Sequence, residues 1–180
     1  MKQIRRNVFE TNSSSTHSIC ISKNPVTIDK FIHFGIGEYG WENDCVGTAN
    51  YLYTAILIQD NRDDLLNKLK TILDSYSIEY EFDEPSWHKS AIGDGVWLEY
   101  GYIDHGYELG EFLDIILSDE DLLMRYLFGD SCVYTGNDNQ DNDPAGCDIA
   151  RAEYYDYYKG ERVPNPYHDE THYDYFYKTN

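Results

Sequence analysis

Residues 60–83 constrain the fold more than any other part of the chain. Apolar residues at helical spacing form one stripe over residues 60–76, made of Leu65, Leu66, Leu69, Ile72, Leu73 and Tyr76. Directly afterwards, Ile78, Tyr80 and Phe82 alternate with Glu79, Glu81 and Asp83, which predicts a half-buried strand. A helix stripe and a strand face each need another layer to cover them. The chain is therefore expected to be α+β.

The rest of the chain supplies further elements of both kinds. Alternation over residues 16–22 predicts a strand with His17, Ile19 and Ile21 on one side. A capping box at Ser118 and Asp121 predicts the start of a short helix that Gly129 stops. The strand at 96–103 is a candidate partner for the strand at 78–83. Other expected elements are an extended segment at 26–34, helices at 48–59, 109–117 and 148–159, and a strand at 131–135.

These elements predict a mostly antiparallel sheet packed by three to five helices in a single compact domain. Residues 1–160 form this acidic α+β domain, with residues 1–15 as a basic N-terminal arm. Residues 161–180 form a Pro/Tyr-rich C-terminal tail, in which Pro164 and Pro166 are expected to prevent regular structure.

The charge is strongly negative and unevenly distributed. The chain has 33 acidic and 14 basic residues, a net charge of −19. Residues 1–30 carry five bases and two acids, so residues 31–180 carry a net charge of −22. Direct binding to duplex DNA by the acidic body is therefore not expected, because such binding depends on neutralising phosphates. The same balance excludes docking on an anionic membrane through a basic face.

Cysteine spacing and the N-terminus bear on the compartment. None of the four cysteines (Cys20, Cys45, Cys132 and Cys147) forms a C-x-x-C pair. They are expected to be buried thiols in a reducing cytosol. No run of 18 apolar residues exists, and no apolar stretch follows the basic N-terminus. The expected location is the cytoplasm.

Tyrosine is concentrated near the C-terminus, where eight of the 18 tyrosines lie in residues 151–180. There they alternate with acids, which gives a surface that is anionic yet large in apolar area. The candidate anchors for a partner are Tyr154, Tyr155, Tyr157 and Tyr158. The alternative is a solvated helix face followed by a frayed tail.

No metal or cofactor site is expected. His168 and His172 would share a helix face, but the segment fits a solvated tail better than a zinc site. The loop from Asn137 to Asp148 lacks the glycine and glutamate of a calcium loop. Asp104 and His105, with Glu108 and Glu111 nearby, could supply an acid and a base, but no nucleophile or phosphate-loop motif supports a defined reaction.

The N-terminal segment is unusually rich in hydroxyl groups. Its residues could bind a phosphate or RNA through side-chain and backbone donors: Arg5, Arg6, Ser13, Ser14, Ser15 and His17. The alternative is a series of turns before the first strand, in which serine and asparagine side chains form hydrogen bonds with their own backbone.

This same segment carries a resemblance to a known family. The run R-R-N-V-F-E-T-N-S-S-S-T-H-S at residues 5–18 resembles the start of a family of small phage and prophage proteins from Firmicutes. Similarity to that family continues through Phe34-Gly35, residues 37–41, 49–54 and 101–105, and so covers roughly residues 4–135. Most of the family has no assigned activity, and the resemblance implies no catalytic residue. It links the chain to anti-CRISPR proteins that act against type II nucleases.

Acidity and this resemblance predict a phage-encoded inhibitor and not an enzyme. A folded acidic body can compete for a basic nucleic-acid channel because it offers carboxylates where phosphates would lie. The partner is expected to be a CRISPR nuclease with its guide RNA, bound by a nucleic-acid mimic or a conformational lock. The predicted acidic contacts are Asp63, Asp64, Glu79, Glu81, Glu111, Asp114, Asp119, Glu120 and Asp121. The alternatives are a small-ligand-binding protein or enzyme that uses the Arg/Ser-rich segment, and a phage assembly component.

Overall fold

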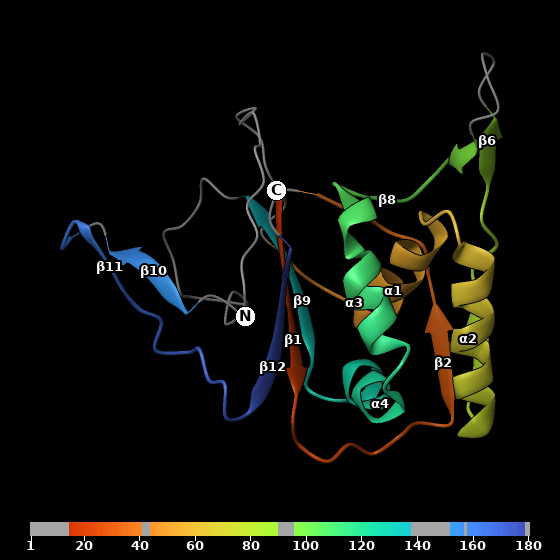
Figure 1. Ribbon diagram of the computed structural model, residues 1–180, viewed down its shortest axis with the longest axis horizontal. Helices are drawn as coiled ribbons and strands as arrows, with labels where there is room; N and C mark the ends of the chain where they lie inside the picture. Colours follow the sequence, from red (N-terminus) through yellow and green to blue (C-terminus); the bar gives the residue numbers. More distant parts are fainter. Residues whose placement is uncertain (1–14, 41–43, 90–95, 138–151, 157, 179–180) are drawn as a thin grey trace.

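The structure, a computed structural model, describes residues 15–40, 44–89, 96–137, 152–156 and 158–178. Its central element is a four-stranded antiparallel sheet in the order β12-β1-β9-β4 (Figure 1). The strands are β1 (Ser15–Ser22), β4 (Asp44–Val46), β9 (Cys132–Asn137) and β12 (Tyr173–Lys178). The predicted strand at 16–22 is confirmed as β1. Its buried residues Ile19 and Ile21 belong to the hydrophobic core together with Val133 of β9.

Helices lie on the core side of this sheet, opposite residues 153–156 and 161–164, and the helix at 62–75 is the farthest of them from the sheet (Figure 1). They are α1 (Thr48–Leu57), α2 (Arg62–Ser75), α3 (Gly110–Ile116), α4 (Glu120–Phe128) and the short 3-10 helix η1 (Gly106–Leu109). Tyr51 of α1 lies fully buried, with its hydroxyl 2.7 Å from His17 Nδ1. Burial raises the pKa of Tyr51 well above its ordinary value. The predicted α+β class with a mostly antiparallel sheet is confirmed.

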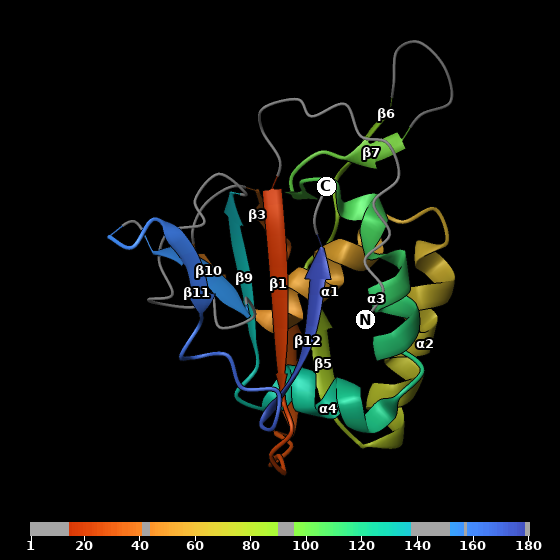
Figure 2. The ribbon, with the colours of Figure 1, turned by 60° about the vertical axis from the view of Figure 1, so that its left-hand side comes forward.

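Two parallel pairs lie beside the central sheet. They join β2 (Phe31–Phe34) to β5 (Glu79–Phe82) and β3 (Glu38–Tyr39) to β8 (Tyr102–Ile103). The predicted pairing of 78–83 with 96–103 is wrong. Two helices between β2 and β5 supply the crossover that a parallel pair needs. The strand β7 (Val96–Leu98) instead pairs locally with β6 (Trp87–Lys89), and this hairpin extends away from the helices (Figure 2).

The C-terminal tyrosine-rich segment is a hairpin, and the predicted helix at 148–159 is wrong where the structure describes it. There, β10 (Glu153–Asp156) pairs with β11 (Glu161–Pro164). Tyrosine favours strands. The turn is fixed by Asp156 Oδ1, which accepts from the backbone N–H of Tyr158 and Lys159. Pro164 ends β11, a position where proline is tolerated, so its predicted exclusion from regular structure is also wrong.

The last strand, β12, is an integral part of the sheet. It pairs with β1 from His17↔Lys178 to Ser22↔Tyr173. The ring of Phe176 meets Phe112 of α3 edge-on at 5.5 Å between centroids. The frayed tail considered for the chain end is therefore not found at residues 173–178. The division of the chain at residue 160 stays a prediction.

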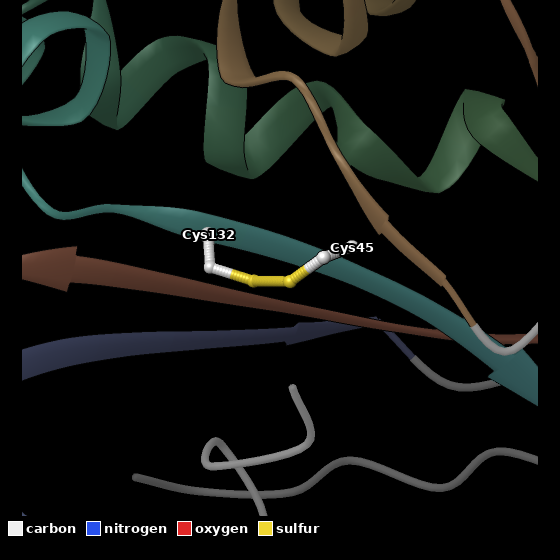
Figure 3. Close-up of a disulfide and its surroundings, with 2 residues drawn as sticks. All are labelled: Cys45 and Cys132. Atoms are coloured by element: carbon white, nitrogen blue, oxygen red, sulfur yellow. A yellow bond between two sulfur atoms is a disulfide. The ribbon is translucent and has the colours of Figure 1, made fainter. Parts of the chain in front are cut away.

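Two of the predicted thiols are joined. Cys45 of β4 and Cys132 of β9 form a disulfide, with their Cα atoms 6.3 Å apart (Figure 3). The sheet brings them together although they are 87 residues apart in the chain. The prediction of thiols is therefore wrong for this pair. It is confirmed for Cys20, which is reduced and fully buried, while Cys147 lies outside the described residues.

Candidate functional site

All nine predicted acidic contact residues have exposed side chains. They lie on α2, β5 and α3 and at the start of α4. The carboxylates of seven of them have no hydrogen bond or ion pair within the described part of the chain: Asp63, Asp64, Glu79, Glu81, Glu111, Asp114 and Glu120. Their charges are therefore available to a partner.

The other two, in the cluster at residues 119–121, have structural partners. Asp119 is the N-cap of α4 and accepts from the backbone N–H of Leu122 at 3.0 Å. Asp121 pairs with Arg125 one turn later at 3.2 Å. The predicted cap at Ser118 is wrong, because its hydroxyl instead accepts from Lys68 Nζ at 3.1 Å.

The predicted tyrosine anchors that the structure describes are separated from the acids of α2. Tyr154 and Tyr155 are half-buried on β10, Tyr158 is fully exposed in the hairpin turn, and Tyr157 lies outside the described residues. In both overall views the β10–β11 hairpin and α2 lie on opposite sides of the molecule (Figures 1 and 2). The acids of α2 and these tyrosines therefore do not form one contact surface.

Of the N-terminal residues predicted to contact a phosphate or RNA, the structure describes only two. Ser15 and His17 are fully buried in β1. Their burial argues against direct contact with a phosphate or RNA and gives them a role in packing the sheet. Arg5, Arg6, Ser13 and Ser14 lie outside the described residues.

An open cleft brings acidic and aromatic side chains together at the carboxyl ends of β2 and β5. Its volume is about 500 Å³, and it is lined by Ile36, Gly37, Glu38, Asp83, Glu84, Ser86, Tyr100 and Gly101. Because β2 and β5 are parallel, the residues that follow each strand meet at the same edge. Tyr102 then donates its backbone N–H to the Gly37 carbonyl at 3.1 Å, which brings the segment before β8 to the cleft wall.

The charge of the cleft is negative. Asp83 accepts from the backbone N–H of Ile36 at 3.2 Å and lies 3.1 Å from His33 Nε2. Glu38 and Glu84 are exposed, and their carboxylates have no ion-pair or hydrogen-bond partner in the described segments. Burial, followed by the charges of Asp83 and Glu84, raises the pKa of the Tyr53 phenol beneath them. No lysine or arginine is among the described lining residues.

Two glycine N–H groups at the cleft, which could otherwise donate to a phosphate, already have partners. The backbone N–H of Gly35 donates to Asn50 Oδ1 at 2.7 Å, and that of Gly37 donates to Thr54 Oγ1 at 3.0 Å. These donors are therefore already used by side chains of α1. With carboxylates around it, the cleft suits a cation and not an anion.

Exposed aromatic rings flank the cleft. Tyr100 in its wall is 67% exposed. Trp97 of the neighbouring β7 is 51% exposed, and its ring is tilted by 38° to that of His88, with 4.9 Å between the centroids. Beside them, the guanidinium of Arg62 lies 4.5 Å from the ring centroid of Trp87. That contact shows a cation already held by an aromatic face in this region. Tyr100 offers a similar face to an incoming cation.

A second hollow, of about 640 Å³, lies between the loop after β1 and α4. Its charged residues satisfy one another. Arg125 contacts both Asp121 and Asp174, and Lys23 contacts Asp174 at 3.3 Å. This network ties β1, β12 and α4 together and leaves little charge for a ligand.

Other kinds of site find no support in the described residues. Within them, no three His, Cys, Asp or Glu side chains are grouped to hold a metal ion. None of the helices in the described residues has the length and hydrophobicity needed to span a bilayer. No family model, curated protein or solved structure matches this chain.

Proposed function

We propose that this chain is a non-enzymatic inhibitor that binds a basic, nucleic-acid-handling protein in the bacterial cytoplasm. The observation that carries the proposal is the acidic and aromatic cleft, which has unpartnered carboxylates at Glu38 and Glu84 and an exposed ring at Tyr100. The family resemblance makes a guide-loaded type II CRISPR nuclease the partner to test first, so the chain would be an anti-CRISPR protein.

The chemistry of the cleft favours an arginine of the partner. A guanidinium can donate two parallel hydrogen bonds to one carboxylate while its flat face lies on an aromatic ring. Glu84 and Tyr100 line the same cleft and offer these two groups. Nucleic-acid channels are rich in arginine, because arginine binds phosphates by the same geometry.

The exposed acids of α2, β5 and α3 would act at longer range. Their charges add to the field that attracts a basic surface and speeds the encounter. This attraction fades over about 8–10 Å at physiological salt, so it steers the partner without holding it tightly. The cleft then supplies the short-range contacts.

The test is inhibition of DNA cleavage by the guide-loaded nuclease. The double variant Glu38→Gln/Glu84→Gln removes two charges from the cleft. The matched control, Glu153→Gln/Glu161→Gln, removes two exposed charges from the β10–β11 hairpin, and its net charge equals that of the cleft variant. The cleft variant should need at least about tenfold more protein for half inhibition, a loss of about 1.4 kcal/mol. The control should remain close to wild type.

Equal weakening of both variants would mean that only net charge matters, and the cleft would have no special role. Absence of inhibition by the wild-type chain would reject this nuclease as the partner. Capture from a host lysate at about 50 mM salt would then show whether another basic protein is retained. Repeating the capture at about 500 mM salt, where charge interactions are screened, would show whether that binding is electrostatic.

A further inference from the structure

Three cysteines lie on one face of three neighbouring strands. Cys20 of β1 is the register partner of Cys132 of β9. Cys45 of β4 is the register partner of Tyr134, two residues beyond Cys132 on β9. Because side chains alternate along a strand, Cys20, Cys132 and Cys45 share a face of the sheet. This is the face opposite Ile19 and Val133, which belong to the core.

Cys132 can reach either of its two neighbours. Its existing bond to Cys45 spans 6.3 Å between Cα atoms. Residues directly opposite each other in an antiparallel pair have Cα atoms about 4.5 or 5.5 Å apart. Both values fall inside the range of about 4.4–6.8 Å that a disulfide accepts. The register therefore allows a Cys20–Cys132 bond as well as the bond that is present.

The strand order also places the three cysteines side by side in the order that exchange requires. β9 lies between β1 and β4, so Cys132 lies between Cys20 on one neighbouring strand and Cys45 on the other. A thiolate attacks a disulfide sulfur from the side opposite the leaving sulfur. Cys20 is thus the attacking group, Cys132 the attacked sulfur and Cys45 the leaving group.

We propose that these cysteines form a thiol–disulfide exchange site. The Cys20 thiol loses its proton, its sulfur bonds to Cys132 Sγ, and the Cys45–Cys132 bond breaks. Cys45 leaves as a thiolate and takes up a proton. One disulfide and one thiol are present before and after the step, so no oxidant or reductant is consumed.

The exchange changes which thiol the solvent meets. Cys20 is fully buried, whereas Cys45 is exposed on the edge strand β4. Exchange therefore converts a buried thiol into an exposed one, which can react with a small thiol reagent or with a thiol of another protein. It also releases β4, only three residues long, from its covalent link to β9.

The test is alkylation of the native, oxidised protein with iodoacetamide, in a Cys147→Ser background that removes the fourth cysteine. Samples are quenched in acid, digested without reduction and mapped by mass spectrometry. The expected product carries the label on Cys45 and a disulfide between Cys20 and Cys132. The same product should form at the same rate when the protein is diluted, because the exchange is intramolecular.

Two variants provide the comparison. Cys20→Ser in the same background should leave Cys45 unlabelled and its bond to Cys132 intact. Cys45→Ser changes an exposed residue and should give the Cys20–Cys132 bond directly on oxidation. Label on Cys20 with the Cys45–Cys132 bond retained would overturn the proposal, as would failure of Cys45→Ser to form the second bond.

Discussion

Loss of the disulfide between Cys45 and Cys132 should destabilise the fold by a measurable amount. The bond links an edge strand to the sheet across 87 residues of sequence. Chain-entropy arguments assign about 4.6 kcal/mol at 25 °C to a closed loop of that length, and native disulfides typically contribute about 2–5 kcal/mol. Total stabilities of domains are about 5–15 kcal/mol, so the expected loss is a large fraction of the whole.

Urea unfolding, followed by tryptophan fluorescence, measures this loss. The oxidised wild type should unfold at a higher urea concentration than the same protein with reductant, by a difference equivalent to about 2–4.6 kcal/mol. The Cys132→Ser variant is the control. Cys20 and Cys45 are then separated by a whole strand, about 9.6 Å, which no disulfide spans.

Cys132→Ser should therefore unfold at one midpoint with or without reductant. Coincident midpoints for the oxidised and reduced wild type would refute the reasoning. That result would mean either that the bond does not form in solution or that β4 contributes nothing to the stability of the sheet.

Three further predictions concern single positions. Asp119→Ala should cost about 1 kcal/mol in urea unfolding because it removes the N-cap of α4, whereas Ser118→Ala should cost less than about 0.5 kcal/mol. Gly101→Ala should cost more than about 1 kcal/mol in the same assay, since Gly101 has φ +104° and an added Cβ would lie 2.3 Å from Ile36 Cγ2. Hydrogen bonds from the Thr171 hydroxyl, then from His172 and the Thr171 backbone N–H, hold the pKa of Asp169 below its ordinary 3.8. The carboxylate therefore stabilises the fold above pH 3.8 and loses this effect as the pH falls through its lowered pKa, so the thermal midpoints of wild type and Asp169→Asn should differ near neutral pH and converge in acid.

Elements with a clear hydrophobic period could be predicted from the sequence. The apolar stripe that begins at Leu65 correctly predicted α2, and the alternation of Ile78 and Phe82 with acids correctly predicted β5. Periodicity reports which face of an element is buried, but it does not report which strand lies alongside. The parallel partner of β5 is 48 residues earlier in register, Phe31 opposite Glu79, and no local signal specifies it.

The disulfide and the cleft could not be predicted from the sequence, for a related reason. Cys45 and Cys132 have no characteristic spacing, and only the order of strands in the sheet brings them together. The cleft draws its residues from three distant segments, near 36–38, 83–86 and 100–101. Its one local signal was the pair Asp83-Glu84 directly after a strand, which net charge alone did not distinguish from the many other acids.

The claim that the cleft binds a guanidinium can be tested without the partner protein. Amide resonances of the ¹⁵N-labelled chain would be followed as a short peptide with two arginines is added, and again with a peptide in which neutral citrulline replaces both arginines. The arginine peptide should shift the amides of Gly37, Glu84 and Gly101 at millimolar concentrations, and the citrulline peptide should not. Equal shifts with both peptides, or shifts confined to other parts of the chain, would contradict the claim.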